Sequence, residues 1–395
     1  MGEATLRERV ADLLSASVRS DVPPFMVMDV MSAAARIEAA GGHVIHMEVG
    51  QPSASAPKTA IAAAHRALDL GRIDYTSALG IASLRERIAR HYRDAYRCRV
   101  DPARIVITTG SSGAFILAFL AMFEPGDRVA VTVPGYPPYR HILTALGCEP
   151  VLIETASDTR HALTGEALLA AHRKTPLKGV LVGSPANPTG TMMSREALTA
   201  LISAAEGAGI RFISDEIYHG LDYAFPAVTA AELSPHALVI NSFSKYFCMT
   251  GWRVGWMVVP EPLVRPIERL QQNLAISVPT LSQIAAEAAF DGMEEMEAIK
   301  RGYVENRRIL IEGLPEAGLT DFLPADGAFY LYADVSRFTG DSLDFAKRML
   351  EQAKVAATPG VDFDPFHGKN FIRFSYARSA DEMREAVTRI AGWLA

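Results

Sequence analysis

From about residue 104, short apolar runs alternate with alanine-rich segments of helical pattern, and this alternation constrains the fold more than any other feature. Alternating strands and helices are typical of a mostly parallel sheet covered by helices. The runs are apolar along nearly their whole length, as parallel strands buried on both faces are. The pattern therefore predicts an α/β fold with a mostly parallel seven-stranded sheet. The seven runs are RIVITT from Arg104, RVAVTV from Arg128, PVLIE from Pro150, KGVLVGS from Lys178, IRFISD from Ile210, ALVINS from Ala237 and VGWMVV from Val254.

The chain is long enough for two domains, because 395 residues exceed the size at which one hydrophobic core usually keeps growing. After about residue 290 the pattern changes to a long charged helix over 294–314, followed by strand-like segments separated by another helix. We expect an N-terminal arm and small-domain helix over 1–48 and a large cofactor-binding domain over 49–290. A smaller α+β domain over 291–395 would complete the chain, with the N-terminal segment packed onto it.

Composition excludes several classes of protein. The formal net charge is -6, and basic residues are scattered among acids, so we expect no nucleic acid partner. The N-terminus lacks the apolar core of a signal peptide, and the most apolar helical stretch is about half the length that spans a bilayer. Cys98, Cys148 and Cys248 are far apart without metal-site spacing. We therefore expect a cytoplasmic protein with neither a membrane partner nor a metal.

Polar clusters follow several of the predicted strands. They include Thr109 to Ser112, Pro134 to Tyr136, Asn187-Pro188, Asp215-Glu216 and Ser242 to Lys245. In open α/β sheets the ligand crevice lies outside the carboxyl ends of the strands. These clusters are therefore predicted to meet at one edge of the sheet and to line a ligand site.

The segment SFSKYFCMTGWRVG, which begins at Ser242, is the most informative stretch. A lysine is usually a solvated surface group. Lys245, however, has Phe243, Phe247 and Met249 around it in the sequence. An apolar environment lowers the pKa of an amine toward the neutral, nucleophilic form that builds a Schiff base. The setting favours a reactive lysine.

This segment resembles the cofactor-lysine motif of the class I and II aminotransferases, the fold-type-I pyridoxal-phosphate family. Further motifs of that family occur in its order over nearly the whole chain, so the resemblance is specific. They are GQP at Gly50, YTSALG at Tyr75, NPTG at Asn187, DEIY at Asp215, GAFY at Gly327 and FIRFSYA around Arg373.

The resemblance implies pyridoxal 5'-phosphate as cofactor, held by Lys245 as a Schiff base. Asp215 would pair with the pyridinium nitrogen and tune the ring as an electron sink. Asn187 and Tyr218 would hydrogen-bond the phenolic oxygen, and Tyr136 would stack on the ring. Taken alone, Asp215 could simply cap a turn after its strand, and Tyr136 could be a core aromatic residue.

The phosphate would lie at the start of the helical run AFILAFLAMF, where backbone N–H groups suit an anion. A plain helix cap also fits this position. By resemblance, the phosphate ligands are Ser111, Ser112, Ser242, Ser244, Arg253 and, from the other subunit of a homodimer with shared active sites, Tyr75.

Arg373 lies inside an apolar strand, where an unpaired guanidinium would be costly to bury. A local salt bridge would satisfy it, but the resemblance implies the α-carboxylate of an amino-acid substrate. Gly50 and Asn187 belong to the same substrate site. Phe25, in the run PPFMVM, would approach the substrate side chain and offers no cation, so we expect neutral apolar or aromatic donors.

The resemblance implies a ping-pong transfer of the amino group from an L-amino acid to a 2-oxo acid such as 2-oxoglutarate, with Lys245, Asp215 and Tyr218 as catalytic residues. The distal carboxylate of 2-oxoglutarate would need a polar exit or a movable arginine such as Arg36 or Arg378. A carbon–sulfur β-lyase of the same fold is an alternative. A non-enzymatic regulator with an aminotransferase-like domain is a remote one, because the residues before Gly50 lack a helix-turn-helix with a basic face.

Overall fold

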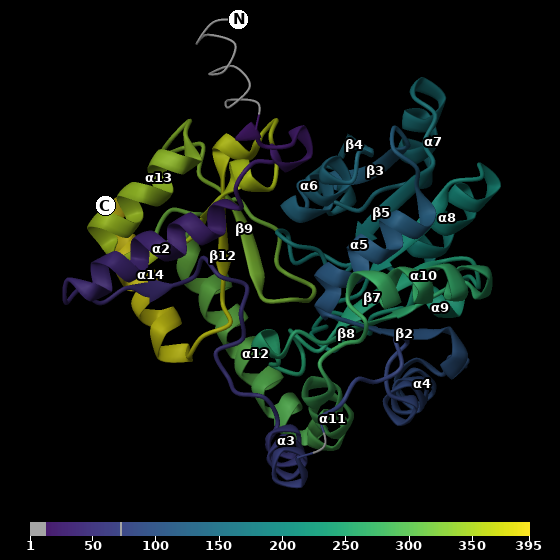
Figure 1. Cartoon of the computed structure of the whole chain (residues 1–395). Helices are drawn as coiled ribbons and strands as arrows, with labels where there is room; N and C mark the ends of the chain where they lie inside the picture. The colour runs from purple at the N-terminus through teal and green to yellow at the C-terminus, as the bar shows by residue number, and fades with distance from the viewer. Residues whose placement is uncertain (1–12, 72) are drawn as a thin grey trace, which may run out of the picture.

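The computed structural model describes residues 13–71 and 73–395, and its largest element is a seven-stranded sheet (Figure 1). The strand order is β2-β8-β7-β6-β5-β3-β4, in which β8 runs antiparallel to both neighbours and the other pairs are parallel. All seven predicted runs form strands, which confirms the mostly parallel α/β architecture. The strands are β2 (Ile105–Thr108), β3 (Arg128–Val133), β4 (Glu149–Glu154), β5 (Gly179–Gly183), β6 (Arg211–Asp215), β7 (Leu238–Ser242) and β8 (Gly255–Val258).

Helices cover both faces of this sheet, and successive strand residues enter two separate buried clusters. In β5, Val180 and Val182 pack into one cluster while Leu181 packs into the other. Burial on both faces explains why the strands are apolar without alternation. One face is covered by α4 (Ala82–Tyr96), α7 (Gly165–Lys174) and α8 (Arg195–Gly207), with the short α9 (Ala230–Leu233) beside them. The other is covered by α5 (Gly110–Met122), α6 (Pro137–Ala145) and α10 (Glu261–Leu274).

A second, smaller unit contains the C-terminal part of the chain. Its antiparallel sheet has the order β11-β12-β9, and a short parallel pair joins β1 to β10. Figure 1 shows the purple N-terminal helix α2 among the yellow C-terminal elements, so this helix and the C-terminal end of the chain share this unit. The elements are α2 (Met26–Ala39), β1 (Ile45–His46), α12 (Met293–Glu316), β9 (Tyr330–Asp334), α13 (Ser342–Arg348), β10 (Val355–Ala356), β11 (Thr358–Pro359), β12 (Phe371–Ser375) and α14 (Ala380–Leu394).

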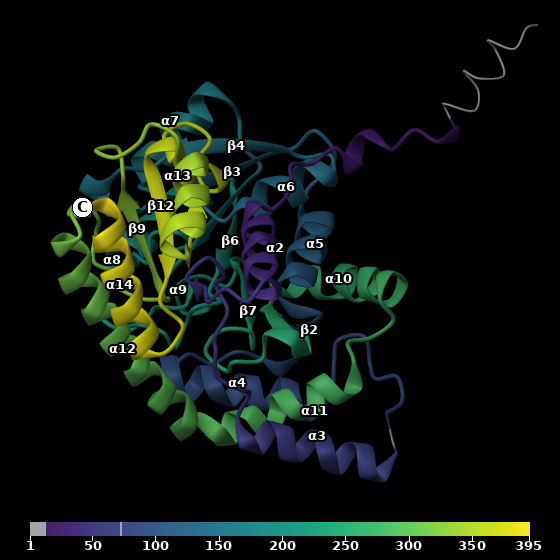
Figure 2. The ribbon, with the colours of Figure 1, turned by 90° about the vertical axis from the view of Figure 1, so that its left-hand side faces the viewer.

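Below the large sheet, α3 (Lys58–Leu70) and α11 (Thr280–Ala289) lie side by side (Figure 2). The loop that leaves α3 is held by α11, where the Gln283 Nε2 donates to Thr76 Oγ1 at 3.0 Å. Tyr75 in that loop has 80% of its surface exposed. In the described part of the chain, no helix combines the length and the apolar character needed to cross a bilayer.

Candidate active site

A cavity of about 180 Å³ lies at the carboxyl edge of the large sheet, between that sheet and residues of the smaller unit. The predicted site residues that line it are Phe25, Gly50, Ser111, Ser112, Tyr136, Asn187, Asp215, Tyr218, Ser244, Lys245, Arg253 and Arg373. Two predicted residues, Ser242 and Tyr75, lie outside the lining. Seven more residues complete it: Val27, Met28, Val49, Tyr139, Pro185, Ile217 and Tyr330. The sheet edge thus gathers segments that are far apart in the sequence.

Lys245 lies in the turn after β7, and its Nζ donates to the Gly50 carbonyl oxygen at 2.6 Å. Phe243 and Phe247 anchor this turn in an aromatic cluster with Trp256. Burial, together with the positive charges of Arg373 and Arg253, lowers the pKa of Lys245 to about 8. Asp215 acts in the opposite direction. The amine is therefore much closer to its neutral form at physiological pH than an exposed lysine would be.

Asp215 ends β6 and is 4% exposed. One carboxylate oxygen accepts from the backbone N–H of Ile217 at 3.0 Å, and the other accepts a short hydrogen bond from the Tyr139 hydroxyl. Burial raises the pKa of Asp215 to about 6, although both hydrogen bonds and the charge of Lys245 oppose this rise. A buried carboxylate with only partial compensation is suited to a cationic ligand group.

The N-terminus of α5 opens into the cavity. Thr109, its N-cap, makes no side-chain capping hydrogen bond. A Cβ on Gly110, whose φ is +65°, would lie 2.5 Å from Arg253 Nη2, so the guanidinium packs directly against this backbone. The Ser242 hydroxyl lies behind the cavity and donates to Ser244 Oγ at 2.9 Å. Free helix amides, lining serines and an arginine together suit a phosphate dianion.

Arg373 is 2% exposed in the middle of β12. Its guanidinium donates to Asn187 Oδ1 at 2.9 Å, to Thr358 Oγ1 at 3.1 Å and to the Glu48 carbonyl oxygen. Its Nε has no partner, and no carboxylate forms an ion pair with it within residues 13–71 and 73–395. The local salt bridge considered from the sequence is thus absent there. The guanidinium has no ion-pair partner, although it is close enough to the buried Asp362 to oppose the rise in pKa that burial gives that carboxyl.

Aromatic and amide groups form the wall between these charges. The ring of Phe25 meets the ring of Tyr136 edge-on, with centroids 5.9 Å apart. Because Asn187 accepts from Arg373 through Oδ1, its amide N–H groups remain available as donors. The hydroxyl of Tyr218 lies 2.7 Å from that of Tyr330. The cavity therefore offers an aromatic platform beside directed hydrogen-bond donors.

The sequence matches a known family, because the profile for aminotransferase class I and II covers residues 42–390. The chain belongs to this family. Valine–pyruvate aminotransferase of Mycobacterium tuberculosis is 48% identical over 382 residues, which cover 96% of this aminotransferase and 98% of that relative. The resemblance identified from the sequence is confirmed.

Solved structures agree with this assignment. A crystal structure of an aminotransferase from Mycobacterium tuberculosis has a TM-score of 0.94 at 48% identity, covering 96% of this aminotransferase and 99% of that chain. Aspartate aminotransferase from Thermus thermophilus with maleate has a TM-score of 0.90 at 31% identity, covering 96% and 99%. This aminotransferase is therefore an enzyme that depends on pyridoxal phosphate. The anion-binding end of α5 and the buried Asp215 fit the phosphate and the ring of such a cofactor.

Two lining tyrosines were missed in the sequence. Tyr139 lies three residues after Tyr136 in the PGYPPY motif, a spacing that places side chains on one side of a helical turn. Tyr330 is the last residue of the GAFY motif and begins β9. Their partners, Asp215 and Tyr218, are far away in the sequence, and no local pattern links them.

Proposed function

We propose that this aminotransferase prefers L-amino acids with neutral apolar or aromatic side chains as donors. The observation that carries the proposal is the inventory of charges in the cavity. Of the residues that line it, the only cations are Lys245, Arg253 and Arg373. Neither Arg36 nor Arg378 is among them. A distal carboxylate would therefore be desolvated without an opposite charge, at a cost of several kcal/mol.

The rest of the substrate wall is apolar. Val27 and Met28 of α2 line the cavity together with Phe25, Val49 and Ile217. A wall that contains methionine accepts several apolar shapes, because the thioether side chain is flexible. The relative named valine–pyruvate aminotransferase is named for an apolar donor, which supports the same preference here.

The set of cations that line the cavity also affects which 2-oxo acid can act as the acceptor. The sequence resemblance implied 2-oxoglutarate, whose second carboxylate would meet the same apolar wall. We propose that a monocarboxylic 2-oxo acid such as pyruvate is the better acceptor and that 2-oxoglutarate is a slower one. The name of the Mycobacterium tuberculosis relative includes pyruvate, which agrees with this choice.

The proposed cofactor ligands follow the geometry. The N-terminus of α5 with Ser111, Ser112, Ser244 and Arg253 would hold the phosphate. Ser242 would act through Ser244, to which it donates. The remaining ligands would surround the ring, with Asp215 at the ring nitrogen, Asn187 and Tyr218 at the ring oxygen and Tyr136 against the ring face. When bound, the cofactor supplies an electron-withdrawing ring that stabilises negative charge at the substrate α-carbon.

The residues then divide the reaction among them. Arg373, which has no carboxylate partner in the described chain, binds the substrate α-carboxylate in the cavity and so orients the α-hydrogen. The neutral Lys245 amine takes the proton from the substrate Cα as general base and delivers it as general acid. The buried carboxylate of Asp215 keeps a negative charge beside the ring nitrogen. Since the amino group stays on the enzyme between the two half-reactions, kinetics should be ping-pong.

Donor kinetics test the proposal. We would measure kcat/KM for valine, methionine, phenylalanine and aspartate with saturating pyruvate, and repeat the series with 2-oxoglutarate. Apolar donors should exceed aspartate by tenfold or more, and pyruvate should exceed 2-oxoglutarate. A tenfold advantage for aspartate would reject the apolar pocket. With a cysteine thioether as substrate, release of pyruvate and ammonia without an oxo-acid acceptor would instead indicate the β-lyase chemistry.

We also propose a homodimer with shared active sites. Tyr75 is largely exposed, and so are Leu70, Leu274 and Ile276 in the segments that surround it. Exposed apolar residues that cluster on one surface are typical of protein interfaces. In the dimer, Tyr75 would reach the phosphate of the partner's site. Tyr75→Phe should weaken cofactor affinity, and an active monomer in sedimentation would contradict the proposal.

The domain division proposed from the sequence is supported by one strand pairing and one helix boundary. β1 pairs with β10, which ties the end of the N-terminal segment to the unit 291–395, and α12 begins at Met293. The large domain would then be 49–290. Cys98, Cys148 and Cys248 are unpaired and buried, which supports the proposed cytoplasmic location.

A further inference from the structure

We propose that Tyr330 is a positioning residue that directs the hydroxyl proton of Tyr218 into the cavity and supports the guanidinium of Arg373. This role rests on the proposed function of Tyr218 as a donor to the cofactor ring oxygen. Tyr330 was not among the residues predicted from the sequence. It contacts groups on three separate segments of the site.

The first contact is with Tyr218. The two hydroxyl oxygens lie 2.7 Å apart, and the rings are nearly perpendicular with centroids 5.6 Å apart. Both side chains are almost fully buried, at 1% exposure for Tyr330 and 6% for Tyr218. Among the described residues, Tyr218 is the only hydrogen-bond partner of the Tyr330 hydroxyl. The pair therefore holds the Tyr218 oxygen at a fixed place.

The surroundings of the two hydroxyl groups indicate which of them donates this hydrogen bond. Each hydroxyl has one proton, so only one of them can donate to the other. Burial raises the pKa of both, but it raises that of Tyr218 well above the ordinary value. The charge of Arg373 opposes this rise for both tyrosines. Among the described residues the Tyr330 hydroxyl has no acceptor other than Tyr218, so we infer that Tyr330 donates to Tyr218 and that the Tyr218 proton is left for the cofactor ring oxygen proposed above.

The second contact is with Arg373. Its guanidinium carbon lies 4.5 Å from the centroid of the Tyr330 ring and 4.7 Å from that of Phe363. Aromatic faces attract a guanidinium and restrict its orientation. Since Arg373 has no carboxylate partner in the described chain, these rings and its hydrogen bonds fix the plane it presents to a substrate carboxylate.

The third contact explains why residue 50 is a glycine. A Cβ added to Gly50 would lie 1.8 Å from the Tyr330 hydroxyl oxygen, a distance that no side chain could tolerate. The carbonyl of the same Gly50 accepts from Lys245. Glycine at this position therefore lets the Tyr330 hydroxyl and the lysine approach the same peptide from two sides.

The test is the pH dependence of the visible absorbance of the holoenzyme, which is measured without turnover. A hydroxyl that donates to the ring oxygen stabilises the deprotonated form of the bound cofactor. Tyr330→Phe should weaken this donor and raise the midpoint of the absorbance change by about half a pH unit or more. In a Tyr218→Phe background, the same substitution should cause no further shift.

Tyr332→Phe is the matched control. Tyr332 lies two residues further along β9, its hydroxyl is also buried, and it does not line the cavity. Its substitution should leave the midpoint unchanged. Tyr330→Leu removes the ring as well, so it should raise the KM of the amino-acid donor about tenfold, whereas Tyr330→Phe should change that KM little.

An unchanged midpoint in Tyr330→Phe would overturn the inference, as would an equal shift in the presence and absence of the Tyr218 hydroxyl. An unchanged midpoint in Tyr218→Phe alone would remove the Tyr218 role and the Tyr330 role with it. The donor preference would survive either result, because donor kinetics in the unmodified enzyme decide it separately.

Discussion

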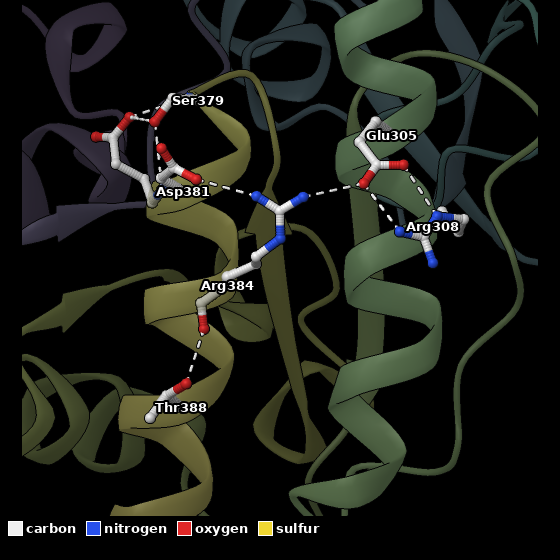
Figure 3. A network of polar contacts seen from close by, with 7 residues as sticks. Glu305, Arg308, Ser379, Asp381, Arg384 and Thr388 are labelled. Carbon is white, nitrogen blue, oxygen red and sulfur yellow. Dashed lines mark hydrogen bonds and ion pairs between the residues drawn. The ribbon is translucent and has the colours of Figure 1, made fainter.

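The charged side chains of the cavity and those that join α12 to α14 are arranged in opposite ways. Between the helices, Arg384 of α14 bridges Asp381 at 3.0 Å and Glu305 of α12 at 3.2 Å (Figure 3). Glu305 also pairs with Arg308 at 2.9 Å. These side chains are all at least 38% exposed. In this surface network every charged side chain is paired with an opposite charge and is also exposed to water.

Two charged residues of the cavity lack both the ion pairs and the exposure to water of that network. Arg373 is almost fully buried without an ion pair in the described chain, and Asp215 is buried with a pKa raised to about 6. A protein retains such costly groups where a ligand supplies the missing charge. Pairing and exposure, rather than the number of charged residues, therefore separate this functional cluster from the surface network.

The largest expected effect comes from removing the reactive amine. Lys245→Ala should abolish nearly all turnover and the visible absorbance of the covalently held cofactor, because no other lining residue carries an amine. Absorbance spectra and borohydride trapping would measure this. Lys300→Ala, which removes a lysine paired with Asp222 at 3.3 Å, is the control and should keep both properties. Trappable cofactor in the Lys245 variant would assign the attachment to another residue.

The next effect concerns the buried guanidinium. Arg373→Gln should lower kcat/KM for amino-acid donors by about 100- to 1000-fold, as expected when one partner of a buried charge pair is truncated. Arg378→Gln removes an arginine five residues further on that does not line the cavity, and it should change kcat/KM little. Steady-state kinetics with one apolar donor would compare the two variants. Similar losses in both would indicate a general effect of charge rather than a carboxylate site.

A smaller effect is the pH dependence of cofactor binding to the apoenzyme. The pKa of Lys245 is lowered to about 8, so the neutral amine predominates above that pH and not only above about 10.4, where an exposed lysine titrates. The rate of covalent attachment should therefore rise with pH and level off above about 8. Arg373→Gln should move this midpoint upward, because the charge of Arg373 lowers the pKa of Lys245. A midpoint near 10.4 in the unmodified enzyme would show that the amine is not desolvated.

The sequence predicted the seven strands and most of the cavity lining for a physical reason. Strand burial and the turn around Lys245 are encoded in short segments, which a local pattern can reveal. The antiparallel placement of β8 and the strand order depend on packing between distant segments and could not be predicted. The same holds for the hydrogen bonds of Tyr139 to Asp215 and of Tyr330 to Tyr218, which span 76 and 112 residues. Such contacts appear only when the chain has folded.

The smallest expected effect tests the exposed side of the comparison. Arg384→Ala removes the side chain that bridges α12 and α14, yet exposed ion pairs are screened by water and contribute little to stability. We expect the melting temperature to fall by no more than about 1 °C. Asn306→Ala is the comparison, because Asn306 follows Glu305 on α12 but is buried. Its side-chain amide donates to the carbonyl oxygens of Tyr376 and Arg378 at 2.9 and 2.6 Å.

Loss of that amide removes the donor from one buried and one partly buried carbonyl group, so Asn306→Ala should lower the melting temperature by roughly 3–6 °C. Calorimetry of the two variants at low and high salt would compare them directly. The small effect of Arg384→Ala should shrink further in 1 M salt, because screening weakens exposed charges, while the effect of Asn306→Ala should persist. If Arg384→Ala proved the more damaging change, the network between α12 and α14 would hold the small domain together, and the exposure of a charged side chain would not predict how little it contributes to stability.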